Sequence, residues 1–299
     1  MELITVFTPT YNRAYTLEDL YQSLQKQSCF CFEWLIVDDG STDNTEEIVS
    51  TFLSDKNSFK IRYYKKENGG KHTAINVGIE LAEGSLFFIV DSDDTLSPDA
   101  IEKLFSWEKS ISDQPQFAGI SGNKGDLQGN LLGTTFCGDT IDATNLERKE
   151  KNILGDKAEA YYTHILKQFP FPVIDGEKFM TENMVWDRIA AAGYKIRWFN
   201  DVIYLVEQRD DGLIAQGNAR YANSPKGYAQ FILQTLRFKN AHWRDKLYAG
   251  FYYYETVKEK VSLVDAAKFL HRSIVSFSLF WLYQSFKIWL KGIAIQEKK

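Results

Sequence analysis

The sequence predicts an α/β protein with a mostly parallel sheet and helices on both faces of that sheet. The first observation is that four short apolar runs, rich in β-branched and aromatic residues, divide the first hundred residues: 3–7, 34–37, 61–64 and 86–90. Runs this short and continuously apolar are typical of central strands buried on both faces. The second observation is that a helical pattern lies between successive runs, as right-handed crossovers between parallel strands require.

The helices between these strands have recognisable start signals. Asp43 is followed three residues later by Glu46, which resembles a capping box at the start of the second helix. The third helix is expected over 73–82. Ser97 is expected to cap the fourth helix, because Pro98 then occupies the first helical position.

The rest of the chain has a different pattern. Glycines recur through 117–136 and predict hairpins and loops. A helical pattern returns over 177–192, and 196–199 and 202–206 have extended character. After a turn at 210–212 the chain is expected to be largely helical.

Composition limits the class of protein. The 299 residues suffice for one large or two fused domains, and 44% apolar with 25% charged residues argues against a disordered chain. The net charge of −5 makes general nucleic-acid binding a poor prediction. Three cysteines favour a reducing compartment, and the first residues resemble no secretory signal. We therefore expect a cytoplasmic protein.

One C-terminal segment, 274–290, is mostly apolar and aromatic. At about 1.5 Å per residue it reaches about 26 Å, short of the roughly 30 Å hydrocarbon core of a membrane. Basic residues flank it, which suits a helix lying in the interface of an anionic membrane. A core helix or a dimer helix is the alternative. The first interpretation predicts peripheral contact with the inner face of the cell membrane.

Acidic residues cluster where two of the predicted strands end. Asp38 and Asp39 follow one strand, and the segment 91–94 (Asp-Ser-Asp-Asp) follows another. The carboxyl ends of parallel strands meet at one sheet edge, where ligands bind in open α/β sheets. Hard divalent cations prefer carboxylate oxygens and substrate phosphates, so Asp91 and Asp93 are candidate ligands for Mg²⁺ or Mn²⁺. The alternative is that these acids only cap a turn.

A glycine-containing loop, Asn68-Gly69-Gly70-Lys71-His72, precedes the third helix. Glycines let backbone amides approach a phosphate, the helix N-terminus carries partial positive charge, and Lys71 adds a full one. The loop is not a Walker A motif, because position 65 is Lys and His72 stands where Ser or Thr is required.

Together these segments resemble the family 2 glycosyltransferases, inverting enzymes of the GT-A fold that use nucleotide-diphosphate sugars. The resemblance covers about residues 1–110 and lies in four motifs in order: 8–13, 37–43, 68–76 and 91–94. It implies a Rossmann-type sheet, a divalent cation, and a donor that is commonly a UDP-sugar. It also implies a saccharide or lipid-linked saccharide acceptor and a role in surface polysaccharide synthesis.

The resemblance also implies residue roles. Tyr11 would lie against the base, Asp39 would contact it, Asp91 would lie near the ribose, and Asp93 would be the catalytic metal ligand on the diphosphate. An aromatic face for a π-system and a carboxylate for an imide N–H fit these roles physically. The expected donor-binding residues are Pro9, Tyr11, Arg13, Asp39, Lys71, Asp91 and Ser92.

The expected organisation is a donor-binding half over 1–110, an acceptor-binding half over 111–215 and a helical region over 216–299. An inverting transfer needs a general base for the acceptor hydroxyl. The family usually supplies an acid ahead of a helix, and Glu182 is the best match, although Asn183 stands where many members have Asp. Asp187 is the alternative base.

Three other functions stay open at this level. A non-catalytic nucleotide-sugar-binding module is favoured only by Asn183. A nucleotidyltransferase should have a glycine-rich loop with Arg after its first strand, and 8–11 (Thr-Pro-Thr-Tyr) is different. Transfer to polyprenyl phosphate would use the same donor site.

Overall fold

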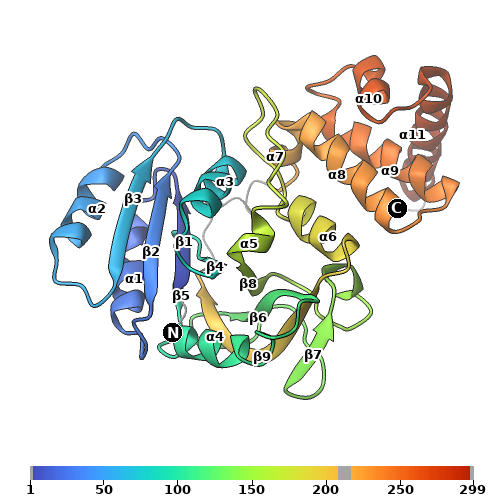
Figure 1. The fold of residues 1–299 in the computed structure, drawn as a ribbon. Coiled ribbons are helices and arrows are strands. Elements are labelled where there is room, and N and C mark those ends of the chain that lie inside the picture. The colour runs from blue at the N-terminus through green and yellow to red at the C-terminus, as the bar shows by residue number, and fades with distance from the viewer. Residues whose placement is uncertain (1–2, 208–216, 297–299) are drawn as a thin grey trace. The chain divides into compact units, whose positions relative to one another are not determined.

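The computed structural model describes residues 3–207 and 217–296, with side chains as far as residue 287 (Figure 1). The turn predicted at 210–212 lies outside the described residues. The chain divides into two compact units. The first comprises Met1–Phe171 and Val185–Arg209, and the second comprises Pro172–Met184 and Asp210–Lys299.

The first unit contains one mixed sheet with the strand order β3-β2-β1-β4-β8-β6-β9-β5, and β7 pairs with β9. Strands β3, β2, β1 and β4 are all parallel, as the sequence predicts, whereas β8 is antiparallel to both β4 and β6. The strand bounds are β1 Ile4–Thr10, β2 Phe32–Asp38, β3 Lys60–Lys65, β4 Leu86–Ile89, β5 Asp94–Leu96, β6 Phe117–Gly125, β7 Thr140–Ala143, β8 Lys157–Tyr162 and β9 Lys195–Val206.

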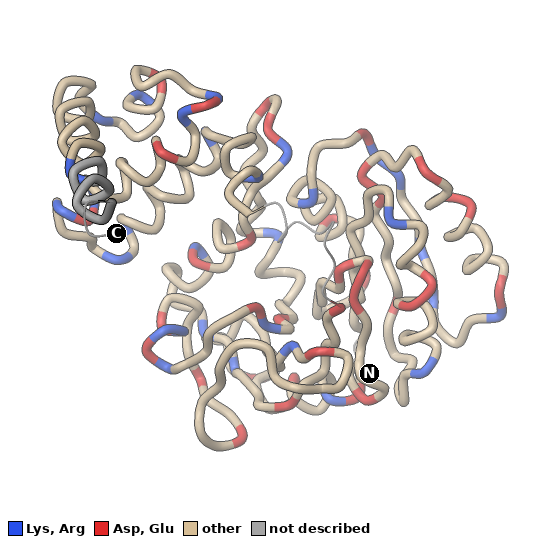
Figure 2. Tube along the Cα trace, turned by 180° about the vertical axis from the view of Figure 1, so that it is seen from behind, with Lys and Arg blue, Asp and Glu red and all other residues tan. Residues whose placement is uncertain are grey.

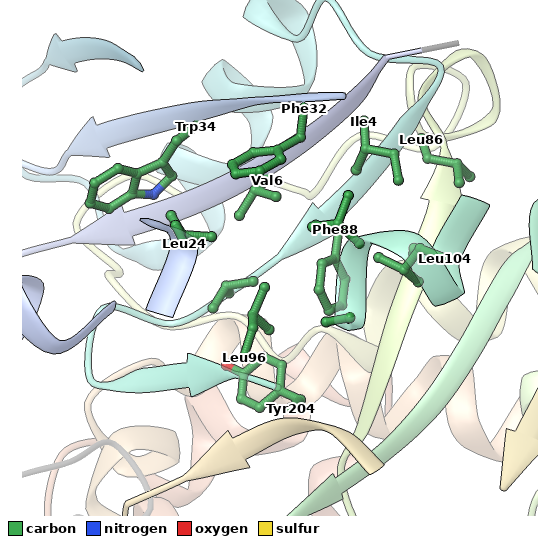
Figure 3. Packing of buried hydrophobic residues seen from close by; sticks show 14 of the residues in the cluster. Ile4, Val6, Leu24, Phe32, Trp34, Leu86, Phe88, Leu96, Leu104 and Tyr204 are labelled. Atoms are coloured by element: carbon green, nitrogen blue, oxygen red, sulfur yellow. The ribbon is translucent and has the colours of Figure 1, made fainter. Parts of the chain in front are cut away.

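Helices cover both faces of this sheet, which confirms the predicted class. One face carries the main core, in which residues of α1 (Ala14–Gln25), α2 (Thr45–Ser54) and α4 (Ala100–Glu108) pack on β1, β2 and β4. Figure 3 shows Val6, Trp34 and Phe88 in this core, with Leu96 and Tyr204 at its lower end. The core therefore joins the parallel strands to β5 and β9.

The opposite face is covered by α3 (Lys71–Leu81) and α6 (Asn183–Ala191). The third helix lies very close to β1, because a Cβ on Gly78 would stand 2.2 Å from Cε2 of Phe7. On the same face the Trp186 ring of α6 stacks on Tyr161 of β8, with ring centroids 4.3 Å apart. Helix α3, on this face, begins within the loop 68–72 that is predicted to bind phosphate.

Two predicted helix caps are wrong. Helix α2 has Asn44 as its N-cap residue, with no side-chain cap, and Asp43 instead accepts a hydrogen bond from the Thr45 hydroxyl. Helix α4 begins at Ala100, so Pro98 precedes it and Ser97 donates to the Asp99 carboxylate. In both places the acidic side chain organises a turn before the helix, and the helix starts one or two residues later.

The middle of the chain also differs from the prediction. Residues 117–125 form one continuous strand, β6, although they contain three of the glycines taken as hairpin signals. A Cβ on Gly119 would stand 2.1 Å from the Ala160 carbonyl oxygen, so this glycine permits close contact with β8. The helix predicted over 177–192 is only Asn183–Ala191, and the two predicted extended segments form one strand, β9.

The second unit is helical, as predicted. It holds α7 (Ala219–Ala222), α8 (Pro225–Phe238), α9 (Trp243–Val257), α10 (Leu263–Phe269) and α11 (Ile274–Gln296). Its core contains Tyr253, Val257, Ala267 and Phe277. Among the described residues, no helix combines the length and apolarity needed to cross a membrane.

Candidate donor-binding and metal site

The predicted motifs of the first unit meet at the carboxyl edge of its parallel strands. Thr10 and Asp38 are paired at the ends of β1 and β2. The Asp39 amide donates to the Thr10 carbonyl at 2.8 Å, and the Lys66 amide donates to the Asp38 carbonyl at 2.9 Å. These bonds bring the turns after β1, β2 and β3 together, as expected from the strand order.

The turns after β1 and β2 are fastened by Asn12. This residue has a φ of 53°, a left-handed conformation that Asn tolerates better than most residues. Its amide donates to the Ser41 hydroxyl at 2.8 Å, and its side-chain oxygen accepts from the Thr42 amide at 2.8 Å. Asp38, fully buried, accepts from the Ser41 amide and the Tyr63 hydroxyl. Polar residues of two motifs therefore shape the rim of the site.

Asp39 lies deeper than expected for a residue that contacts a base. It is buried, and its carboxylate accepts from Lys66 Nζ at 2.6 Å and from the amides of Gly69 and Gly70 at 3.0 and 2.7 Å. The Asn68 side chain donates to the same carboxylate at 3.2 Å. A carboxylate accepts about four hydrogen bonds, so these four donors occupy the acceptor capacity of Asp39. In this conformation Asp39 therefore holds the glycine loop against β2.

That loop leads directly into α3 and a charged pair. Gly70, with a φ of 94°, is the N-cap residue of α3. Lys71 Nζ lies 2.6 Å from the Asp91 carboxylate, so the predicted phosphate-binding lysine pairs with the predicted acidic turn. His72 is buried, and its two ring nitrogens have no hydrogen-bond partner in the described part of the chain. Burial lowers the pKa of His72, which favours a neutral ring.

The acidic turn 91–94 concentrates negative charge in a partly buried place. Although burial opposes ionisation, the charges of Lys71 and Lys124 hold the pKa of Asp91 below its ordinary value. Burial, followed by the charge of Asp91, raises the pKa of Asp93. The same two causes raise the pKa of Asp94 to about 7. A cation placed beside Asp93 would relieve this repulsion.

The turn fits a metal that is shared with a phosphate-bearing substrate. No group of three or more His, Cys, Asp or Glu within the described residues is arranged to hold a metal by itself. Mg²⁺ and Mn²⁺ sites in nucleotide enzymes commonly use one or two carboxylates, with phosphate oxygens and water as the other ligands. Asp91 and Asp93 supply that number of carboxylates. The donor set therefore matches the predicted metal.

Tyr204 of β9 also holds the acidic turn, and the sequence analysis did not identify it. Its hydroxyl accepts from the Asp91 amide at 2.9 Å and donates to the Asp94 carboxylate at 2.8 Å. The ring is buried, with Lys124 Nζ 3.9 Å from its centroid. Short β5 pairs with β9 beside it, Leu96 opposite Tyr204. A residue 113 positions from Asp91 thus fixes the shape of the turn.

The remaining predicted donor-binding residues differ in exposure. Pro9 is buried within β1, where it pairs with Val37, and Ser92 is buried in the acidic turn. Tyr11 is 47% exposed, which leaves its ring accessible at the rim. Arg13 donates to the Tyr15 hydroxyl, and its charge acts on Asp93. Tyr11 and Arg13 are therefore the accessible members of the first motif.

The two candidate bases lie in different units. Glu182 directly precedes α6 and belongs to the second unit. Asp187 belongs to the first unit, where its carboxylate accepts from the Asn145 side chain at 2.7 Å. Nearby, Glu177 accepts from the amides of Lys226 and Gly227, both at 2.8 Å, so it stabilises the N-terminus of α8.

Sequence comparison finds similarity to a known family. Residues 5–116 match the model of the family described as glycosyl transferase family 2. The glycosyltransferase GlyG of Streptococcus pneumoniae is 29% identical over 224 residues, which cover 71% of this chain and 73% of GlyG. TuaG of Bacillus subtilis, named for teichuronic acid biosynthesis, is 36% identical over 119 residues, 40% of this chain and 47% of TuaG.

Solved structures share the fold. S. aureus TarS 1-349 in complex with UDP-GlcNAc aligns with a TM-score of 0.60 and 18% identity, over 96% of this chain and 92% of the TarS chain. The mannosyltransferase PcManGT of Pyrobaculum calidifontis, in complex with GDP-Man and Mn²⁺, aligns with a TM-score of 0.57 and 18% identity, over 96% and 82% of the two chains. At this identity the likeness concerns the fold.

Proposed function

We propose that this chain, which is similar to the family 2 glycosyltransferases, transfers a sugar, with inversion, from a UDP-sugar to a saccharide or lipid-linked saccharide in surface polysaccharide synthesis. The meeting of the glycine loop, the N-terminus of α3 and the acidic turn carries this proposal. The 2.6 Å pair between Lys71 and Asp91 lies between the element proposed to bind phosphate and the element proposed to bind metal, which supports the proposal. A nucleoside diphosphate bound to a divalent cation needs both.

The base would lie at the rim formed by the first two motifs. Tyr11 offers an exposed aromatic face, and stacking on a nucleobase uses such a face. We keep Asp39 in the donor site but give it a different task. Because its carboxylate already accepts from the glycine loop, it would hold that loop in the shape that receives the diphosphate. Pro9 and Ser92 would shape the site from beneath.

The metal would be held by Asp93, with Asp91 beside it. When bound, Mg²⁺ or Mn²⁺ would neutralise the charge that develops on the leaving diphosphate. Lys71 would exchange part of its contact with Asp91 for a phosphate oxygen, and the α3 N-terminus would add its partial positive charge. PcManGT, which shares this fold, was solved in complex with GDP-Man and Mn²⁺, and this supports a divalent cation in the proposed site.

Inversion requires a base on the face of the sugar opposite the leaving group. We propose Glu182, which directly precedes α6, for this task. Asp187 is less suited to it, because its carboxylate already accepts a 2.7 Å hydrogen bond from Asn145. The proposal places the donor residues within 1–110 and the acceptor residues within 111–215. It also places the protein at the inner face of the cell membrane, through residues 274–290.

The donor site can be tested by thermal unfolding with UDP, GDP or CMP, each with Mn²⁺ and then with a chelator. A ligand at one hundred times its dissociation constant adds about 2.7 kcal/mol to the free energy of unfolding. We expect UDP to stabilise the protein only with metal, and Asp93→Ala to lose that effect. Asp113→Ala, at an exposed aspartate after α4, is the matched control. No stabilisation by any nucleotide with metal would contradict the proposal.

The base can be tested with Glu182→Gln and Asp187→Asn, assayed for transfer from UDP-sugars to saccharides and to polyprenyl phosphate. We expect Glu182→Gln to keep nucleotide binding and lose transfer by about two orders of magnitude or more, the range for a general base. Full transfer by this variant, with loss in Asp187→Asn, would move the role to Asp187. Transfer to polyprenyl phosphate alone would redefine the acceptor.

A further inference from the structure

Helix α11 has one apolar face that packs within the second unit. Phe277 and Gln284 are buried, and Trp281 Nε1 donates to the Glu255 carboxylate of α9 at 2.6 Å. The Tyr254 ring of α9 meets Phe277 and Trp281 edge-on, with ring centroids 6.2 and 5.3 Å apart. Residues 277, 281 and 284 share one side of a helix, so this face is the seam with α9.

The same helix has a second apolar face, and its side chains are exposed. Four side chains lie 55 to 64% exposed: Val275, Leu279, Leu282 and Phe286. Their spacing of four, three and four residues places them in one stripe, and 100° per residue puts that stripe opposite the seam. Tyr283, 56% exposed, lies beside it. We call these five residues the outer stripe. A helix face turned only to water would be polar.

Charge is distributed unevenly between the two parts of the chain. Residues 210–299 contain 14 Lys and Arg against 7 Asp and Glu, a net charge of +7. Residues 1–209 contain 21 against 33, a net charge of −12. The Lys and Arg positions along the C-terminal helices are visible in Figure 2. Among them Lys268 and Lys287 are exposed, close in sequence to the outer stripe.

These features favour a lipid surface over a second copy of the chain. Two copies joined through the outer stripe would bring two segments 210–299 together, each with a net charge of +7, and like charges oppose such an association. An anionic bilayer offers both an apolar layer for the stripe and opposite charge for the lysines and arginines. The aromatic rings of Tyr283 and Phe286 suit the boundary between headgroups and acyl chains. No described helix can span a membrane, so the helix would lie in the interface.

We propose that the outer stripe of α11 docks on an anionic lipid surface, with the surrounding lysines and arginines directed to the headgroups. This inference rests on the proposed function in one respect: both place residues 274–290 at a membrane surface. None of the stripe residues is among those proposed to bind the donor. In this proposal the stripe residues contact the lipid, and the positive net charge of residues 210–299 attracts the anionic surface.

The test is sedimentation of the full chain with vesicles of phosphatidylcholine alone or mixed with phosphatidylglycerol. We expect binding to the anionic vesicles that weakens at high salt, because surface charges are then screened. Leu279→Asp and, separately, Val275→Asp should weaken it by about tenfold or more, the loss expected for one buried aliphatic side chain. Leu127→Asp, at a leucine that is 52% exposed in the first unit, is the matched control and should bind like the wild type.

Three results would overturn the inference. They are absence of binding to anionic vesicles, equal binding by the Asp variants, and a dimer in solution that Leu279→Asp dissociates. Equal thermal unfolding temperatures of wild type and variants would show that the variants are folded. Stabilisation by UDP and Mn²⁺ without vesicles tests the donor site independently, so the two proposals can fail separately.

Discussion

Removing the hydroxyl of Tyr204 tests how the acidic turn is held. Tyr204→Phe keeps the ring, which is buried edge-on to Phe88 with centroids 6.3 Å apart. It deletes two hydrogen bonds, the 2.9 Å bond from the Asp91 amide and the 2.8 Å bond to the Asp94 carboxylate. The change therefore isolates the oxygen from the packing.

The cost follows from these two bonds. At pH 8, above the pKa of Asp94, the bond from Tyr204 goes to a charged group. A hydrogen bond to a charged group contributes about 1.5 to 3 kcal/mol, and a neutral one contributes about 1 kcal/mol. Asp94 is almost fully buried, so water cannot readily replace the lost donor. We expect the variant to lose about 2 to 4 kcal/mol of its free energy of unfolding. We also expect UDP with Mn²⁺ to stabilise it less, since the turn would no longer be held in one shape.

Urea unfolding measures the first effect, and thermal unfolding with and without UDP and Mn²⁺ measures the second. Tyr194→Phe is the control, because Tyr194 is half-buried and packs edge-on against Phe169 away from the turn. If Tyr204→Phe unfolded at the same urea concentration as wild type and kept the full nucleotide effect, the hydroxyl would have no positioning role.

Three further predictions concern parts of the first unit. Asp39→Asn replaces an acceptor with a donor beside the glycine loop, so UDP should stabilise the variant less and urea unfolding should show a loss of about 1 to 3 kcal/mol. Burial lowers the pKa of Lys157 to about 8, so its proton leaves the folded chain before the unfolded one. The free energy of unfolding of wild type should therefore rise relative to Lys157→Met between pH 8 and about 10.5, by up to about 3 kcal/mol; a constant difference in urea unfolding would refute this. Gly78→Ala should destabilise by about 1 to 3 kcal/mol through the Phe7 ring, whereas Gly227→Ala, whose Cβ would lie 3.1 Å from the end of Met180 and 3.2 Å from the Glu177 carboxylate, should cost less in thermal unfolding.

The parallel part of the sheet could be predicted from sequence because its signals are local. Strands β1, β2 and β4 each contain a short apolar run, whereas β3, at the end of the strand order, carries Lys60, Arg62 and Lys65. The parallel runs place the polar residues that follow them at one sheet edge. The pairing of Lys71 with Asp91 could not be predicted in this way, because β3 and β4 are separated by β2 and β1 and only the placement of α3 brings the two residues together. Predictions from sequence were wrong where one residue type has two possible structural roles. Gly119 was expected to mark a turn, but it permits a close contact inside a strand.

The way the acidic turn is held could not be predicted, for a physical reason. Strand β5 has only three residues, Asp94–Leu96, too few for any periodicity to register. It pairs with β9, whose Tyr204 lies 110 positions after Asp94, so its position depends on chain folding rather than on neighbours. The sequence around a buried tyrosine does not show which groups its hydroxyl contacts. The turn proposed to bind metal thus depends on a strand outside the residues that carry the four sequence motifs, and for this reason we expect Tyr204→Phe to change nucleotide binding without altering those residues.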